Sequence, residues 1–217
     1  MNPTISTFDS TKEPLADLLK GANEGKLQLP DFQRGWVWDD HHIVSLIGSI
    51  GTAYPIGAVM LLETGNPDVK LKTRFIEGVK DTSNKNPERL ILDGQQRLTS
   101  LYQSLYSPNP VKTRDTRGSE IERFYYIDIK MALNASYDLE EAVLSIPSSK
   151  QVINFRKEVV TDYTTDELEW KAEVFPCNLI LNSGKWDDWS WGYIDAGGSE
   201  LLKERRERWK AFKTKIL

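Results

Sequence analysis

The sequence predicts an α+β fold, in which a mixed sheet with flanking helices is followed by a less regular, tryptophan-rich and partly helical segment. Up to about residue 130, short apolar runs of strand length are interspersed with segments of helical periodicity. Beyond that point the periodicity fades, and four of the seven tryptophans lie within residues 170–191. A chain of 217 residues can bury a real core, as one domain or as one domain with an appendage.

Helix signals occur at both ends of the chain. A short helix is predicted over residues 13–19, capped near residues 10–11 and ended at Gly21, and a second helix runs from residue 39 or 40 towards Ile50. Further helices are predicted at residues 166–173 and 201–213. The face of the last helix carries Leu202, Arg205, Trp209 and Phe212. We interpret it as a solvated amphipathic helix, with a helix that contacts nucleic acid as the alternative.

Strands are predicted from short apolar runs between turn signals, at residues 57–62, 73–77, 90–92 and 124–129. Polar and charged residues predict loops at residues 80–88 and 108–120. The clustered tryptophans are expected to pack in the core or in a lid. A platform on which bases stack is the alternative.

In the stretch from Asp93 to Tyr102, a glycine turn is followed by two neighbouring glutamines and an arginine at the start of an amphipathic helix. A helix begun at Gly94 directs its free backbone N–H groups outward, where they attract an anion. The helix dipole contributes about 0.3–1 kcal/mol, and charge-assisted bonds from Arg97 contribute about 1.5–3 kcal/mol each. Alternatively, Asp93 is simply the N-cap, Gly94 a tight turn and Arg97 a solvated residue.

A second segment favours the anion-binding interpretation of residues 93–102 over the capped-helix interpretation. Residues 29–38 read Leu-Pro-Asp-Phe-Gln-Arg-Gly-Trp-Val-Trp, a helix-like stretch leads to Ile50, and Tyr-Pro-Ile-Gly follows at residues 54–57. With Asp-Gly-Gln-Gln-Arg-Leu-Thr at residues 93–99, these four ordered blocks resemble the N-terminal domain of GmrSD-type modification-dependent restriction proteins. That bacterial and archaeal family of unknown function has a ParB/sulfiredoxin-like fold. The resemblance covers roughly residues 12–130.

The resemblance implies a nucleotide site. Gly94 and Arg97 fall on the Gly-x-x-Arg element that binds nucleotide phosphates in ParB-like and sulfiredoxin-like relatives. Gln33 and Arg34 look like a second wall of the same pocket. Arg34 and Arg97 would then face one polyphosphate, whose oxygens each planar guanidinium can bind in pairs. The expected nucleotide- and phosphate-binding residues are Gln33, Arg34, Gly94, Gln95, Arg97 and Thr99.

The expected cofactors are a nucleoside triphosphate, GTP or ATP, and Mg²⁺. Asp93 is the candidate metal ligand, because Mg²⁺ prefers one or two carboxylates together with substrate phosphates. Gln95 or Gln96 could orient an attacking water, as glutamines do in phosphoryl transfer. Asp93, Gln95 and Gln96 are therefore the candidate catalytic residues.

The preferred function is a nucleotide-binding regulatory module of a restriction and anti-phage defence system, with nucleotide hydrolysis as an option, which gates a nuclease domain or subunit. DNA is then reached through a larger assembly, and a second copy of the chain is a further partner that the sequence allows. The alternative is a non-enzymatic ParB-like module that binds DNA or another protein, and whose cradle takes a backbone phosphate. A weaker interpretation makes Asp93 the metal ligand of a nuclease.

Other chemistry is excluded by composition. His41 and His42 are the two histidines, and as neighbours on a helix they cannot form the spaced pair of a metal hydrolase or a His-Asn-His nuclease site. The sequence holds no P-loop motif. The net charge of −4 and the isoelectric point near 5.4 give no global basic field for DNA.

Compartment signals are few. Cys177 has no second cysteine with which to pair, and the sequence holds no signal peptide and no apolar stretch of membrane-spanning length, so no membrane association and a cytoplasmic location are expected. We predict a ParB/sulfiredoxin-like core at residues 1–133 and an appended, mainly helical and irregular segment at residues 134–217. Family members continue further, so the chain is expected to be a fragment or a short form.

Overall fold

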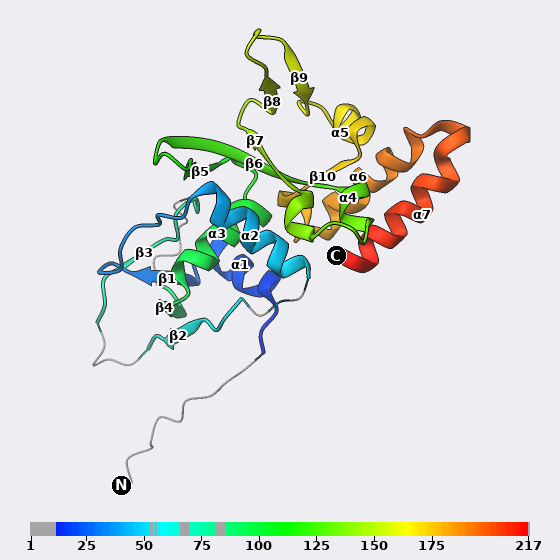
Figure 1. Cartoon of the computed structure of the whole chain (residues 1–217). Coiled ribbons are helices and arrows are strands. Elements are labelled where there is room, and N and C mark those ends of the chain that lie inside the picture. The colour runs from blue at the N-terminus through cyan, green and yellow to red at the C-terminus, as the bar shows by residue number, and fades with distance from the viewer. Residues whose placement is uncertain (1–11, 53, 55, 66–69, 81–85, 217) are drawn as a thin grey trace.

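The computed structural model describes residues 12–52, 54, 56–65, 70–80 and 86–216 (Figure 1). Helices and strands are mixed along the whole of this range, which confirms the predicted α+β class. The expected helix cap at residues 10–11 lies outside the described residues.

A mixed sheet forms the first half of the molecule, as predicted. Its strands, in sheet order, are β2 (Met60–Glu63), β4 (Arg89–Asp93), β1 (Leu27–Pro30) and β3 (Thr73–Arg74). β1 and β4 are parallel, whereas β2 and β3 pair antiparallel at the two edges. Because β1 and β4 run in the same direction, the segments that follow them leave the sheet at the same edge. This edge positions the site described below.

Three helices accompany this sheet: α1 (Leu15–Asn23) contacts β1, α3 (Gln95–Leu105) contacts the other two helices, and α2 (Asp40–Gly51) also contacts the second half of the chain. Asp39 caps α2, since its carboxylate accepts a hydrogen bond of 2.9 Å from the backbone N–H of His42. α1 differs from its prediction. It starts after Pro14 without a side-chain cap and continues through Gly21, and the left-handed turn comes later, at Gly25 with φ +72°.

A second, antiparallel sheet contains the strand predicted at residues 124–129. Its strands are β5 (Val111–Arg114), β6 (Glu120–Asp128), β7 (Val143–Pro147) and β10 (Val174–Pro176). β6 is central and pairs with the other three. The loop predicted at residues 108–120 is wrong in part, because β5 lies within it. Its alternating burial, with Val111 and Thr113 inward and two charged residues outward, is the ordinary pattern of a strand with one exposed face.

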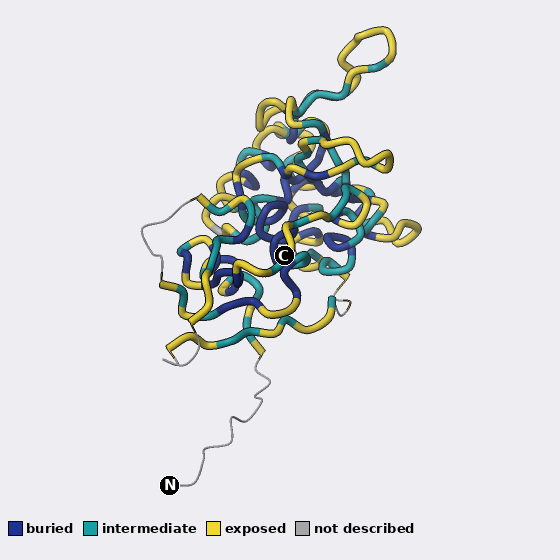
Figure 2. Tube along the Cα trace, turned by 90° about the vertical axis from the view of Figure 1, so that its left-hand side faces the viewer, coloured by how far each residue is buried: buried dark blue, intermediate teal, exposed yellow. Residues whose placement is uncertain are grey.

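The remaining elements complete the second half. They are the α-helices α4 (Ile129–Leu133), α5 (Asp166–Ala172), α6 (Ser183–Asp195) and α7 (Gly198–Ile216), the 3₁₀ turns η1 (Leu139–Ala142) and η2 (Cys177–Leu179), and the hairpin β8 (Gln151–Ile153) and β9 (Val159–Asp162). α5 and α7 confirm the helices predicted at residues 166–173 and 201–213. Figure 2 shows the buried segments gathered in the middle of the molecule and an exposed loop, the tip of the β8–β9 hairpin, at the top.

The core is continuous across both halves. Leu19, Ile91 and Leu101 of the first half and Phe175 and Phe212 of the second belong to one cluster of buried hydrophobic residues. The domain boundary predicted after residue 133 stays a prediction, but the core does not stop there. No helix within the described residues is long and apolar enough to cross a membrane.

Aromatic side chains hold α6 and α7 on the second sheet. The ring centroid of Phe175 lies 5.0 Å from that of Trp189 and 5.4 Å from that of Trp209, distances typical of favourable aromatic pairs. Trp189 and Trp209 are buried, as expected for core packing, whereas Trp191 is 63% exposed. The predicted face of α7 is therefore turned towards the core, and Arg205 within it donates a hydrogen bond to the carbonyl of Tyr193 at 2.7 Å.

Glu173 joins three elements through its buried carboxylate. It accepts hydrogen bonds from Tyr193 at 2.7 Å and Arg208 at 2.5 Å, and its other oxygen lies 2.9 Å from the ammonium of Lys130. Burial disfavours the charged form, but the bonds from Tyr193, Lys130 and Arg208 outweigh burial and hold the pKa of Glu173 below its usual value. In its ionised form this carboxylate, at the end of α5, stabilises the junction with α4, α6 and α7.

Candidate functional site

The candidate site lies where β4 passes into α3. Gly94 is the N-cap of α3 and has φ +89°, a left-handed conformation that glycine adopts without steric cost. A Cβ at this position would also lie 3.0 Å from the side chain of Val59. Asp93 is therefore not the N-cap, and the alternative interpretation of the motif fails on this point. Because Gly94 has no side chain, it cannot cap the first-turn N–H groups of α3.

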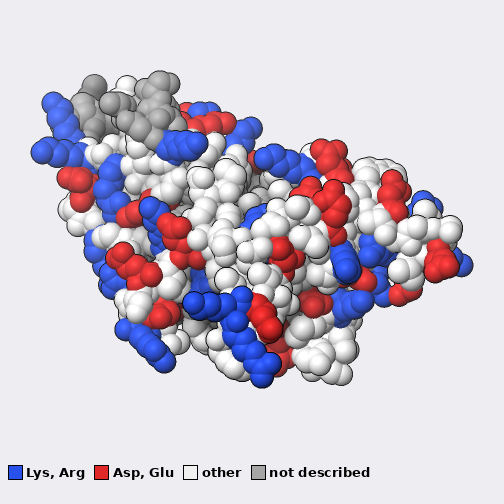
Figure 3. All heavy atoms as spheres, turned by 90° about the horizontal axis from the view of Figure 1, so that it is seen from above, with Lys and Arg blue, Asp and Glu red and all other residues white. Residues whose placement is uncertain are grey.

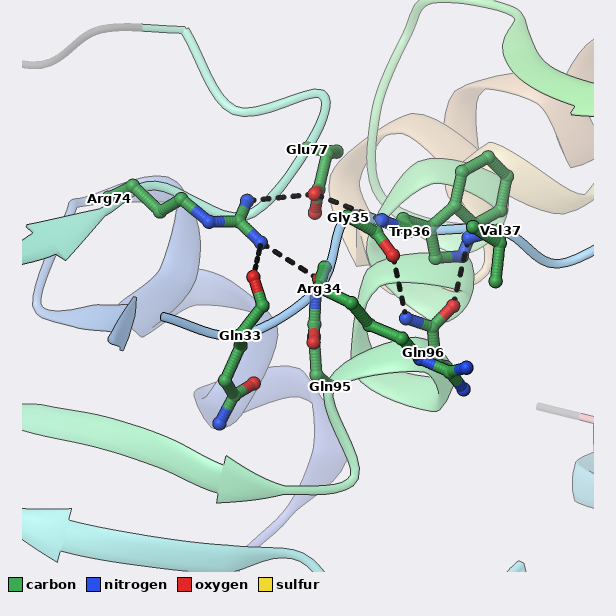
Figure 4. A network of polar contacts seen from close by, with 9 residues as sticks. All are labelled: Gln33, Arg34, Gly35, Trp36, Val37, Arg74, Glu77, Gln95 and Gln96. Atoms are coloured by element: carbon green, nitrogen blue, oxygen red, sulfur yellow. Dashed lines mark hydrogen bonds and ion pairs between the residues drawn. The ribbon is translucent and has the colours of Figure 1, made fainter. Parts of the chain in front are cut away.

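Two glutamines at the start of α3 hold the segment that follows β1. Gln95 donates from Nε2 to the carbonyl of Arg34 at 2.7 Å. Gln96 donates to the carbonyl of Gly35 at 3.1 Å and accepts from the N–H of Val37 at 2.9 Å, as a neighbouring strand would (Figure 4). We refer to these three bonds between α3 and residues 34–37 as the glutamine clamp.

Gln33 fixes the same segment to the sheet. Its Nε2 donates to the carbonyls of Ile91 at 2.6 Å and Leu92 at 3.1 Å, at the end of β4. The structure thus places Gln33 and Arg34 beside residues 93–97, although about sixty residues separate them in the sequence.

Arg74 and Glu77 complete this network, and sequence reasoning did not select them. Arg74 donates to the carbonyls of Gln33 at 3.3 Å and Arg34 at 3.1 Å, and to Glu77 Oε1 at 2.8 Å (Figure 4). Glu77 Oε1 also accepts from the N–H of Trp36 at 3.1 Å. Opposite charges three residues apart, in a segment predicted as a strand, were the signal available in the sequence. That strand is shorter than predicted, since β3 ends at Arg74.

Arg97 is committed to the protein backbone in this conformation. Its guanidinium donates to the carbonyls of Ile56 and Ala58, the latter at 3.0 Å, and lies 3.6 Å from the carboxylate of Asp93. A Cβ on Gly57, whose φ is +91°, would lie 2.0 Å from Arg97 Nη1. Arg97 therefore anchors residues 56–58 beside α3, and β2 begins at Met60 and not at the predicted residue 57. Its expected phosphate contact stays a prediction that requires it to exchange these carbonyl partners.

The other predicted residues differ in accessibility. Thr99 is fully buried, and its hydroxyl has no hydrogen-bond partner among the described residues, so it does not reach the surface of the site. The Asp93 side chain is 72% exposed. Arg34 is exposed, and its guanidinium makes no hydrogen bond or ion pair within the described residues. Figure 4 shows its side chain extending towards Gln96 at the start of α3. The side chains available to a ligand are therefore those of Arg34 and Asp93. Beside them, Gly94 leaves the first turn of α3 without a side-chain cap.

Comparison with known proteins gives this arrangement a family. Residues 15–189 match the family described as the GmrSD restriction endonuclease, N-terminal domain. This chain belongs to that family. The match confirms the resemblance found in the four motif blocks, and it extends well beyond residue 130, where the resemblance was expected to end.

The GmrSD N-terminal domain described here also has a relative in an archaeon. An uncharacterized protein of Methanocaldococcus jannaschii is 33% identical to it over 177 residues, which are 79% of this chain and 29% of the relative. The chain thus spans less than a third of the length of this relative.

Proposed function

We propose that this domain binds a nucleoside triphosphate at the start of α3 and acts as a regulatory module of a restriction system, gating a nuclease supplied elsewhere. The observation that carries the proposal is the position of Arg34. Its guanidinium is exposed and unpaired among the described residues, while its backbone is held to α3 by Gln95 and to the end of β3 by Arg74.

This arrangement suits a polyphosphate. The first-turn N–H groups of a helix have no intrahelical acceptors, and the helix dipole favours an anion beside them. A guanidinium binds two phosphate oxygens at once, which adds direction to the charge attraction. Since the glutamine clamp fixes the Arg34 backbone, less conformational entropy is lost when its side chain binds.

Asp93 is suited to a supporting role with Mg²⁺. Among the described residues, no three His, Cys, Asp or Glu side chains gather into a metal site. Mg²⁺ does not need such a group, because it is commonly bound by one or two carboxylates together with phosphate oxygens. Exposed Asp93 would hold the ion beside the triphosphate. Hydrolysis assisted by Gln95 or Gln96 would require their amides to leave the clamp, and nucleotide binding does not depend on it.

Calorimetry with ATP and GTP, with and without Mg²⁺, tests the proposal. We expect Arg34→Ala to weaken nucleotide binding about tenfold or more, the effect of losing a charged hydrogen bond. Arg156→Ala is the matched control, because it removes another exposed arginine, from the β8–β9 hairpin. The proposal fails if the unmodified domain binds neither nucleotide, or if Arg34→Ala and Arg156→Ala bind equally well.

A DNA-backbone phosphate in the same place has less support. The chain carries a net charge of −4, and on the face drawn in Figure 3 acidic and basic side chains are interspersed, without a broad basic region. A DNA affinity that falls steeply with salt, and that is lost in Arg34→Ala, would favour this alternative over nucleotide binding.

A further inference from the structure

We propose that a second site, unrelated to Arg34, binds a small organic cation such as an alkylammonium or quaternary ammonium compound. It is a cavity of about 480 Å³ in the second half of the chain, which we call the aromatic cavity. This volume is within the range of small-molecule sites. Residues from β6, α5, α6 and η2 line it, and none of the residues of the glutamine clamp does.

The inner wall of the aromatic cavity already binds an ammonium group of the protein itself. Lys150 Nζ lies 3.2 Å from Glu169 Oε1, 5.6 Å from the ring centroid of Phe124 and 5.9 Å from that of Tyr126. These distances are those of cation–π contacts, in which the negative face of the ring attracts the cation. The wall therefore combines a carboxylate with aromatic faces, a combination that suits a cation.

Glu169 is fixed in this wall. It is 2% exposed and accepts hydrogen bonds from Tyr126 at 3.1 Å and from Trp189 Nε1 at 3.0 Å. Burial raises the pKa of Glu169 above its usual value, although Lys150 and Trp189 partly oppose the shift. Because Lys150 balances the charge of Glu169, the inner wall is close to neutral when both are ionised.

The outer wall repeats the combination of carboxylates and an aromatic ring, and no cation–π contact to that ring occurs among the described residues. Trp170 lines it and is held rigidly, since a Cβ on Gly192 of α6 would lie 2.0 Å from its ring. Asp166 and Asp188 also line the cavity, are exposed, and make no side-chain ion pair or hydrogen bond within the described residues. The aromatic surface and the two carboxylates are thus available to a ligand.

Charge decides between a cationic and an anionic ligand. On the outer wall, two carboxylates stand against one ammonium group, that of Lys185. The surrounding residues 158–199 carry nine acidic side chains against two lysines. A nucleotide phosphate would be repelled here, whereas an organic cation gains from both the carboxylates and the rings.

Titration with choline, followed by tryptophan fluorescence and calorimetry, tests the proposal. We expect saturable binding that changes the emission of Trp170 and Trp189. The uncharged isostere 3,3-dimethyl-1-butanol has nearly the same shape, so it separates cation attraction from apolar burial, and it should bind about tenfold more weakly or worse. Tetramethylammonium and spermidine extend the comparison to other cations.

Two neighbouring aspartates provide matched variants. Asp188→Asn removes a carboxylate from the cavity wall, whereas Asp187→Asn makes the same change at an exposed residue that does not line it. Asp188→Asn should weaken choline binding about two- to fivefold, the scale of a partly exposed ion pair, and Asp187→Asn should not. Arg34→Ala should leave choline binding unchanged, which keeps this test separate from that of the nucleotide site.

Several results would overturn the proposal. One is the absence of saturable binding by choline, tetramethylammonium and spermidine up to about 10 mM. Others are equal affinity for choline and its uncharged isostere, or equal losses in Asp188→Asn and Asp187→Asn. Preferential binding of AMP in the cavity, with quenching sensitive to Asp188→Asn, would assign the site to an anionic ligand instead.

Discussion

Replacing Gln96 by leucine tests whether the glutamine clamp positions Arg34. The substitution keeps the side chain close to its original size but removes both the donor to Gly35 and the acceptor for Val37. A backbone N–H group and a carbonyl in the segment 34–37 then lose their partners on α3.

The expected loss of stability follows from the exposure of these bonds. A hydrogen bond contributes about 0.5–1.5 kcal/mol net to folding. Water reaches both bonds of Gln96, so we take the low end for each, and Gln96→Leu should lower the free energy of unfolding by about 1 kcal/mol. At the clamp itself, the Val37 amide becomes free to exchange with solvent, and the segment that carries Arg34 loses part of its support.

Urea unfolding and amide hydrogen exchange at Val37 measure the two effects, and nucleotide calorimetry measures the consequence at Arg34. Gln103→Leu is the matched control on the same helix. The Nε2 of Gln103 is buried without a partner among the described residues, so this change should be neutral or should stabilise by up to about 1 kcal/mol. Unchanged Val37 exchange in Gln96→Leu, with stability equal to the unmodified domain, would refute a clamp.

Further predictions concern Arg97 and two buried glutamates. Gly57→Ala should displace Arg97 and cost about 1 kcal/mol more in urea unfolding than Gly65→Ala, since both glycines have positive φ but nothing lies within 4 Å of a Cβ at residue 65. Glu173 has a lowered pKa when folded, so its stabilisation is present above the unfolded value near 4.5 and is lost as pH falls through the folded value. Glu173→Gln should therefore cost about 3 kcal/mol at pH 7 and progressively less in acid. Glu169 has a raised pKa, so its contribution is lost as pH rises, and the stability of Glu169→Gln relative to the unmodified domain should improve from pH 4 to pH 7. Identical pH profiles for the two glutamine variants would contradict both assignments.

Local signals in the sequence were sufficient for several elements. The apolar run at residues 90–92, Gly94 and the periodic residues of α3 lie next to one another in the chain, and a strand, a turn and a helix each depend on a few neighbouring residues. The cap at Asp39 is local in the same sense. The ordered motif blocks also indicated the family, and with it the proximity of Gln33 and Arg34 to residues 93–97.

The tertiary structure decided what these side chains do. Arg97 was predicted to face a phosphate, yet its acceptors are carbonyls about forty residues away, at Ile56 and Ala58. The glutamines were predicted to orient water, yet their amides bind backbone groups about sixty residues away. Arg74 supports Gln33 and Arg34 from a segment that is distant in the chain. The aromatic cavity likewise combines distant segments. A side chain's type and the turn around it are properties of a few residues, whereas its partner depends on which distant backbone is packed within hydrogen-bonding distance, and only the folded chain determines that.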